Sequence, residues 1–177
     1  WRRFSRTLRR DPRRRSTSLT PNPPSTSLRA GPMTKETKGI ATKKIRLRWT
    51  GTGMEYLGNG EKGPAVIIDG KSEKGPGPMD ALLYSLAGCM AVDVQSILEK
   101  SRVPLSGLEV EVEAKRAPSH PKYYTGIKLV YRVEGPQEEH GAKLDRAVSL
   151  SREKFCLVLH SLRSDIDIDI DIHRTGS

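Results

Sequence analysis

The sequence predicts an α+β fold in which runs of strands are separated by only two helices. Three observations predict it. Several short segments alternate apolar and charged residues, as half-buried strands do. The segment from Ala81 to Val92 has no charged residue and belongs to a longer stretch with leucines at helical spacing. The segment from Asp165 to Ile172 alternates strictly between Asp and Ile, which is typical of a strand.

The first 32 residues differ in composition from the rest of the 177-residue chain. They hold nine arginines, one aspartate and five prolines, and contribute +8 of the formal net charge of +10. Such a segment buries too little apolar surface to offset chain entropy, so we predict a disordered basic tail over 1–32 and a folded domain over 33–177. Met33 is the expected natural start. An organellar transit peptide and a nucleic-acid-binding arm are the alternatives, and the scarcity of aromatic residues among the arginines argues against the arm.

The folded part is expected to begin with a three-stranded meander. Residues 43–49 place Ile45, Leu47 and Trp49 on one face and Lys44, Arg46 and Arg48 on the other. Glycine-rich turns then separate two further strands, 54–57 and 65–68.

A long helix is expected next, over about 79–101. Pro78 suits the first turn of a helix, and Pro104 ends it. Because this helix is apolar on most sides, other structure must wrap around it.

Two strands, a second helix and a last strand follow. The strands cover 108–113 and 127–133, and the glutamates of the first are expected to pair with the basic residues of the second. The second helix covers 142–162. The aspartates of the last strand, 165–172, are expected to face solvent or to pair with the basic face of 43–49.

Two cysteines are the candidate reactive groups. Cys89 lies in the apolar helix, next to the small pair Ala87-Gly88 and one turn before Asp93. Cys156 flanks the apolar stripe of the second helix. Each thiol is either a packed core residue or half of a pair, because helices that cross at these positions bring the sulfurs within disulfide range. In a pair, one thiolate attacks an oxidant and the other closes a disulfide.

Other chemistry is not expected. The two cysteines lack a CxxC unit, so the sequence predicts no metal and no other cofactor. The four histidines have no partner at ligand spacing: His120, His140, His160 and His173. The alternating aspartates have no glycine for a calcium loop and are expected to form a solvated face: Asp165, Asp167, Asp169 and Asp171. No uninterrupted apolar run reaches the roughly 18 to 20 residues of a membrane span, so a cytoplasmic protein without a membrane partner is expected.

The segment from Gly75 to Val94 closely resembles the OsmC/Ohr family signature around its first cysteine, in the branch described as OsmC-like. Leu108–Glu113, His120-Pro121-Lys122 and Glu153–Cys156 resemble later segments of that family. The resemblance covers about 43–172. It implies an intertwined homodimer in which two central helices are wrapped by sheets of both subunits.

The resemblance also implies a thiol-dependent peroxidase that reduces organic hydroperoxides in defence against oxidative stress. Cys89 would attack the peroxide, Cys156 would resolve the product as a disulfide, and a dithiol such as a dihydrolipoyl group would restore both thiols. The family's arginine is missing from the loop 50–53, and Met79 stands where its glutamate follows the helix-start proline.

Three residues are candidates for the missing supporting roles, namely Asp80, Asp93 and Arg48. A non-catalytic member of the family is the alternative function. It would bind a small apolar or thiol-reactive ligand, or sense oxidants.

Overall fold

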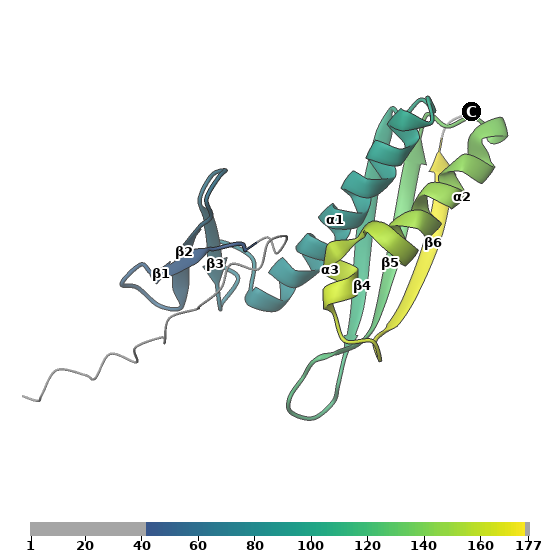
Figure 1. Ribbon diagram of the computed structural model, residues 1–177. Helices are drawn as coiled ribbons and strands as arrows, with labels where there is room; N and C mark the ends of the chain where they lie inside the picture. Colours follow the sequence, from purple (N-terminus) through teal and green to yellow (C-terminus); the bar gives the residue numbers. More distant parts are fainter. Residues whose placement is uncertain (1–41, 176–177) are drawn as a thin grey trace, which may run out of the picture. The chain divides into compact units, whose positions relative to one another are not determined.

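The computed structural model describes residues 42–175, and the predictions for the basic tail and for a start at Met33 lie outside these residues. Two three-stranded sheets and a group of helices make up the described chain (Figure 1). The elements are, in order, β1 (Arg46–Trp49), β2 (Glu55–Asn59), β3 (Val66–Asp69), α1 (Pro78–Lys100), β4 (Gly107–Arg116), β5 (Tyr124–Glu134), η1 (Glu138–His140), α2 (Gly141–Leu150), η2 (Ser151–Phe155), α3 (Leu157–Ser161) and β6 (Asp167–Thr175). The predicted α+β class and the order of its strands are confirmed.

The N-terminal sheet is the predicted antiparallel meander, in the order β1-β2-β3. Its tight first turn is held by the Trp49 indole N–H, which donates to the Gly53 carbonyl at 3.1 Å. The expected burial of one face of β1 is wrong for a single chain, because Ile45, Leu47 and Trp49 are all exposed. An apolar sheet face is therefore left open.

The C-terminal sheet has the order β4-β5-β6, with β4 antiparallel and β6 parallel to the central strand β5. α1 and the segment from α2 to α3 lie over one face of this sheet (Figure 1). Alternate residues of β5 face the helices and are buried, because a strand points successive side chains to opposite faces. They are Ile127, Leu129, Tyr131 and Val133.

The opposite face of this sheet carries charge pairs. Arg132 lies 2.7 Å from Glu111 and 3.8 Å from Glu109, as the predicted pairing of acidic and basic faces requires. Lys128 pairs with aspartates of β6 and not with the glutamates of β4, since its Nζ lies 2.6 Å from Asp171 and 3.6 Å from Asp169. The suggested pairing of these aspartates with the basic face of β1 is therefore wrong. The parallel register places Lys128 directly beside Asp169, so the nearest cation is in the same sheet.

The predicted second helix, 142–162, is not continuous. α2 gives way to a single π-helical turn, η2, and the backbone then leaves the helical region at Cys156, with φ −68° and ψ 97°. The wider π turn shifts the residues that follow relative to the apolar stripe. Cys156 therefore points inward and is fully buried.

Helix α1 is the long apolar helix that the sequence predicts. Its buried stripe packs on the sheet and consists of Leu86, Met90, Val94 and Leu98. By length and composition α1 could also cross a membrane, and among the described residues it alone meets that criterion. A core helix meets the same criterion, and the buried stripe of α1 belongs to the hydrophobic core.

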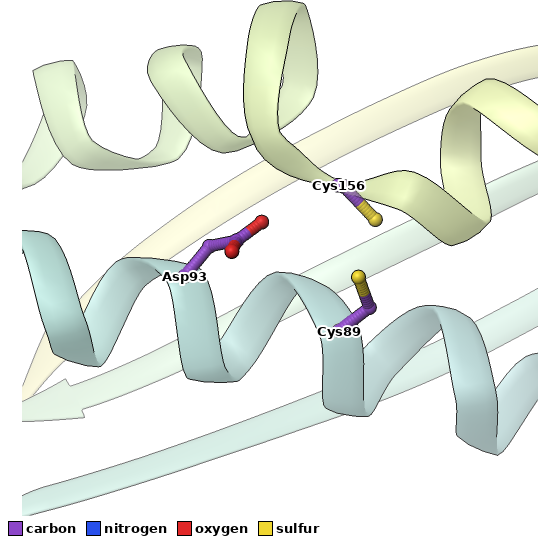
Figure 2. A group of neighbouring side chains, drawn as sticks. All are labelled: Cys89, Asp93 and Cys156. Carbon is purple, nitrogen blue, oxygen red and sulfur yellow. The ribbon is translucent and has the colours of Figure 1, made fainter. Parts of the chain in front are cut away.

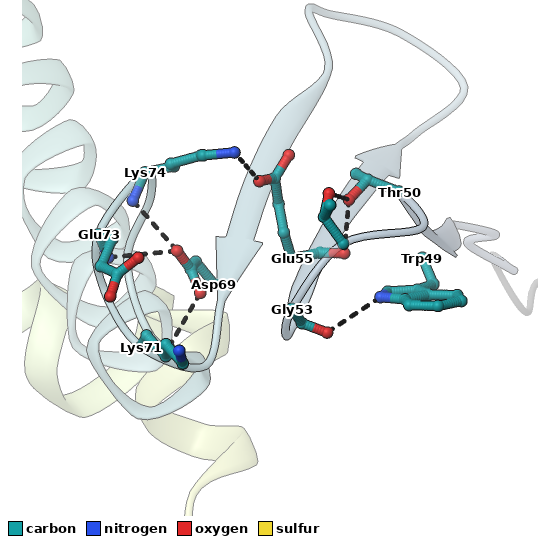
Figure 3. Close-up of polar contacts among 9 residues, drawn as sticks. Trp49, Thr50, Gly53, Glu55, Asp69, Lys71, Glu73 and Lys74 are labelled. Carbon is teal, nitrogen blue, oxygen red and sulfur yellow. Dashed lines mark hydrogen bonds and ion pairs between the residues drawn. The ribbon is translucent and has the colours of Figure 1, made fainter.

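The loop before α1 is organised by Asp69, which is only 4% exposed at the end of β3. Its carboxylate accepts backbone N–H groups of Lys71, Lys74 and Glu73 at 2.9, 3.1 and 3.2 Å (Figure 3). The Lys71 N–H contributes most to lowering the pKa of Asp69, and burial opposes it. The loop also packs tightly on β3, since a Cβ at Gly75 would lie 2.6 Å from the Ile67 carbonyl oxygen.

We expect Asp69→Asn to lower the melting temperature by several degrees at neutral pH, because one amide oxygen replaces two carboxylate oxygens that accept three N–H groups. Because folding lowers the pKa of Asp69, the ionised carboxylate stabilises the folded chain. This contribution is fully present at pH values above the ordinary aspartate pKa of about 3.9. This contribution is lost as the pH falls through the lowered folded value. Thermal unfolding from pH 2 to 8 checks this, with exposed Glu73→Gln as the control. A difference between wild type and Asp69→Asn that does not shrink on acidification would contradict it.

Candidate functional site

The two cysteines meet between α1 and the break before α3. The Sγ atoms of Cys89 and Cys156 and a carboxylate oxygen of Asp93 all lie within 4.8 Å of one another. Figure 2 shows the two sulfurs pointing toward each other, with the carboxylate beside them. Both thiols are free. The sequence-based hypothesis that the helices bring the two cysteines together is therefore confirmed.

The two thiols have different surroundings. Cys89 is half-buried, whereas Cys156 has no exposed surface. Burial raises the pKa of the Cys156 thiol, the N–H of Leu159 that donates to its sulfur at 3.3 Å opposes this, and Cys89 and Asp93 raise it further. Cys156 is therefore held as a neutral thiol. Cys89 is the thiol that a solute can reach.

Asp93 is fixed in place by Ser151. The Ser151 hydroxyl is fully buried and donates a hydrogen bond to Asp93 Oδ2 at 2.9 Å. The two residues are 58 positions apart, so this contact ties the π-helical turn η2 to α1. The sequence identified Asp93 from its place one turn after Cys89, but nothing in the sequence indicated its partner.

Tyr131 of β5 is a further polar group at this site. It is fully buried, and among the described residues its hydroxyl has no hydrogen-bond partner. Burial raises the pKa of Tyr131, and the neighbouring Cys156, Asp93 and Cys89 raise it further, so the hydroxyl remains a donor. The sequence analysis assigned Tyr131 to the apolar face of a strand. A tyrosine among Ile, Leu and Val on a buried face was the signal that could have identified it, because a buried hydroxyl needs a partner.

A cavity of about 400 Å³ opens beside the carboxylate. Its walls combine apolar side chains with the polar end of α1 and comprise Asp93, Ser96, Ile97, Lys100, Phe155 and Leu157 among others. Phe155 and Leu157 flank Cys156 in sequence and are both exposed. A small apolar molecule can therefore approach the cluster from this side.

Two further residues that the sequence proposed lie outside the cluster in a single chain. Asp80 is in the first turn of α1, where its Oδ1 lies 4.0 Å from the Arg116 guanidinium. Arg116 also donates to the Tyr124 hydroxyl, which in turn donates to the Met79 carbonyl and ties the start of α1 to the sheet. Arg48 lies exposed on β1. Supporting roles for Asp80 and Arg48 stay predictions.

Comparisons with known proteins identify the family and agree with the fold. Residues 70–171 match the family model described as OsmC-like protein. Protein YhfA of Escherichia coli K12 is 36% identical over 126 residues, which cover 71% of this chain and 92% of that protein. The crystal structure of a hypothetical protein from Aquifex aeolicus is 29% identical, with a TM-score of 0.69, and the match covers 78% of this chain and 99% of that one.

The organic hydroperoxide resistance protein OhrB of Bacillus subtilis is similar in fold. The TM-score is 0.53 at 17% identity, and the match covers 75% of this chain and 98% of that one. This likeness concerns the fold alone.

Proposed function

Because the chain belongs to the OsmC-like protein family, we propose that it is a peroxidase that reduces organic hydroperoxides through Cys89 and Cys156. One observation carries the proposal, namely that two free thiols lie within 4.8 Å of each other, one reachable and one buried. Disulfide formation from this arrangement requires only a small movement, because the sulfurs already face each other (Figure 2). The fold similarity to OhrB, named for organic hydroperoxide resistance, supports the substrate class.

The reaction follows from the different surroundings of the two thiols. The Cys89 thiolate attacks the terminal oxygen of the hydroperoxide, the O–O bond breaks, and the alkoxide leaves as the alcohol after taking up a proton. Cys89 is now a sulfenic acid. The Cys156 sulfur attacks it, an S–S bond forms, and hydroxide leaves as water. A small dithiol such as a dihydrolipoyl group then returns two electrons and two protons and is itself oxidised to a disulfide.

Substrate choice is assigned to the cavity beside Asp93. The side chains of Ile97, Phe155 and Leu157 offer apolar surface to the tail of an organic hydroperoxide. Hydrogen peroxide has no such tail and gains nothing from this surface.

We expect Phe155→Ala to lower kcat/KM for cumene hydroperoxide about tenfold, because an apolar wall is removed. Its kcat/KM for hydrogen peroxide should be unchanged. Steady-state kinetics with both peroxides measures the ratio, and Phe155→Leu is the matched control that keeps an apolar wall. An equal loss toward both peroxides would show damage to the thiol pair and not to a tail-binding surface.

The proposal includes a homodimer. The apolar face of the N-terminal sheet and one face of α1 are exposed in a single chain, and exposed apolar surface on this scale is typical of protein interfaces. The chemistry also requires a compartment that keeps thiols reduced, so the proposal places the protein in the cytoplasm.

A redox sensor that does not turn over is the second candidate function. One observation favours it: the loop 50–53 lacks the family's arginine, and a cationic neighbour is what usually promotes a reactive thiolate.

The deciding experiment measures cumene hydroperoxide consumption by the reduced full chain with dihydrolipoamide as reductant. A peroxidase consumes many equivalents of peroxide, and peptide mapping of the oxidised protein finds a Cys89–Cys156 disulfide. A sensor forms the same disulfide but consumes a single equivalent without turnover. If both thiols remain free after excess peroxide, both functions are excluded.

A further inference from the structure

The cluster of Cys89, Asp93 and Cys156 contains three groups that bind metal ions once deprotonated. Two sulfurs and a carboxylate oxygen form a ligand set suited to Zn²⁺. We propose that in the reduced protein Cys89, Asp93 and Cys156 bind one Zn²⁺ ion.

The separations fit such an ion after a small adjustment. Zinc lies about 2.3 Å from sulfur and about 2.0 to 2.2 Å from a carboxylate oxygen, so tetrahedral ligands are about 3.5 to 3.8 Å apart. The three ligand atoms are already within 4.8 Å of one another. Side-chain movements that shorten these separations by about 1 Å therefore close the site, and the backbone of α1 and of the break at Cys156 can stay in place.

The surrounding polar groups support a charged occupant. Ser151 already orients the Asp93 carboxylate at 2.9 Å, as outer-shell donors orient metal ligands. Tyr131 belongs to the same core as Cys156 and is a fully buried donor without a partner among the described residues. A ligating thiolate or carboxylate carries the negative charge that such a donor can stabilise.

The fourth position is left for solvent. The cavity beside Asp93 gives water access to the ion, so three protein ligands and one water complete a tetrahedron. Coordination releases the two thiol protons to solvent and involves no oxidation. Cys89 and Cys156 cannot bind Zn²⁺ and form a disulfide at the same time, so the ion protects the reduced pair.

The test is titration of the reduced full chain, without air, using Co²⁺ as a spectroscopic probe and then Zn²⁺ in a calorimeter. We expect one ion per chain, with the thiolate-to-Co²⁺ charge-transfer absorption that only sulfur ligands give. Asp93→Asn should weaken Zn²⁺ binding at least tenfold, and Cys89→Ser or Cys156→Ser should weaken it further and reduce the charge-transfer band by half or more. Asp145→Asn, an exposed carboxylate of α2, is the matched control and should bind as wild type does.

Asp93→Asn keeps an oxygen that can accept the Ser151 hydroxyl, so it tests the ligand without opening the core, and circular dichroism verifies the fold. Absence of the charge-transfer band in the wild type would overturn the proposal. So would Zn²⁺ binding that Cys89→Ser leaves unchanged, because another site would then hold the ion. These readouts need no peroxide. A chain that binds Co²⁺ but does not turn over hydroperoxide therefore contradicts the peroxidase alone.

Discussion

Replacing Cys89 by serine is expected to reduce hydroperoxide turnover by about three orders of magnitude or more, because the attacking sulfur is lost. The reason for choosing Cys89 and not Cys156 as the attacking group is structural. Cys89 is half-buried, whereas Cys156 is fully buried and its pKa is raised by that burial. Stopped-flow consumption of cumene hydroperoxide with dihydrolipoamide measures the effect.

Cys156→Ser is the matched control, since it makes the same substitution on the other side of the pair. It should still react once with peroxide and accumulate a sulfenic acid on Cys89, detected as a mass increase of one oxygen atom and by trapping with dimedone. If Cys156→Ser abolishes the first reaction and Cys89→Ser does not, the two roles are reversed. Equal and complete loss in both would indicate that the pair acts as a unit from the first step.

The main elements of the fold were predictable because their signals are local. Strict alternation predicted β4, β5 and β6, and charge-free helical spacing predicted α1 with nearly its observed ends. The pairing of Lys128 with β6 was not predictable in the same way, because it depends on β6 lying parallel to β5. Strand neighbours are set by the tertiary fold, and alternation alone does not reveal them.

The candidate site could be predicted only in part. Cys89 and Asp93 are one helical turn apart, so their proximity follows from the sequence. Cys156 joins them because the π-helical turn precedes a break in the helix, and helical periodicity predicted no break there. Ser151 and Tyr131 reach the site from distant segments, and nothing local marks them. The proposed zinc ligand set was not apparent from the sequence for the same reason, since its third ligand comes from that break.

One face of α1 carries large side chains that are exposed in a single chain, as they would be in a subunit interface before assembly. Tyr84 and Val92 are 69% and 64% exposed, and Gly88 lies between them at helical spacing, where a Cβ would meet nothing within 4 Å. These residues follow the i, i+4, i+8 spacing, so they share one face of α1. Two copies of such a face can pack against each other closely across a two-fold axis, with the small Gly88 allowing the backbones to approach.

We therefore expect Val92→Glu to convert the proposed dimer to a monomer, because it would bury an unpaired carboxylate in a poorly solvated interface. A penalty of about 3 kcal/mol already weakens association about a hundredfold. Light scattering coupled to size-exclusion chromatography measures the mass over a range of concentrations. Ala142→Glu adds the same charge at an exposed position of α2 and should leave the dimer intact. A wild-type chain that is monomeric at all concentrations would contradict the dimer. An unchanged mass for Val92→Glu would place the interface on another face. The open side of the β1-β2-β3 sheet would then be the next face to test.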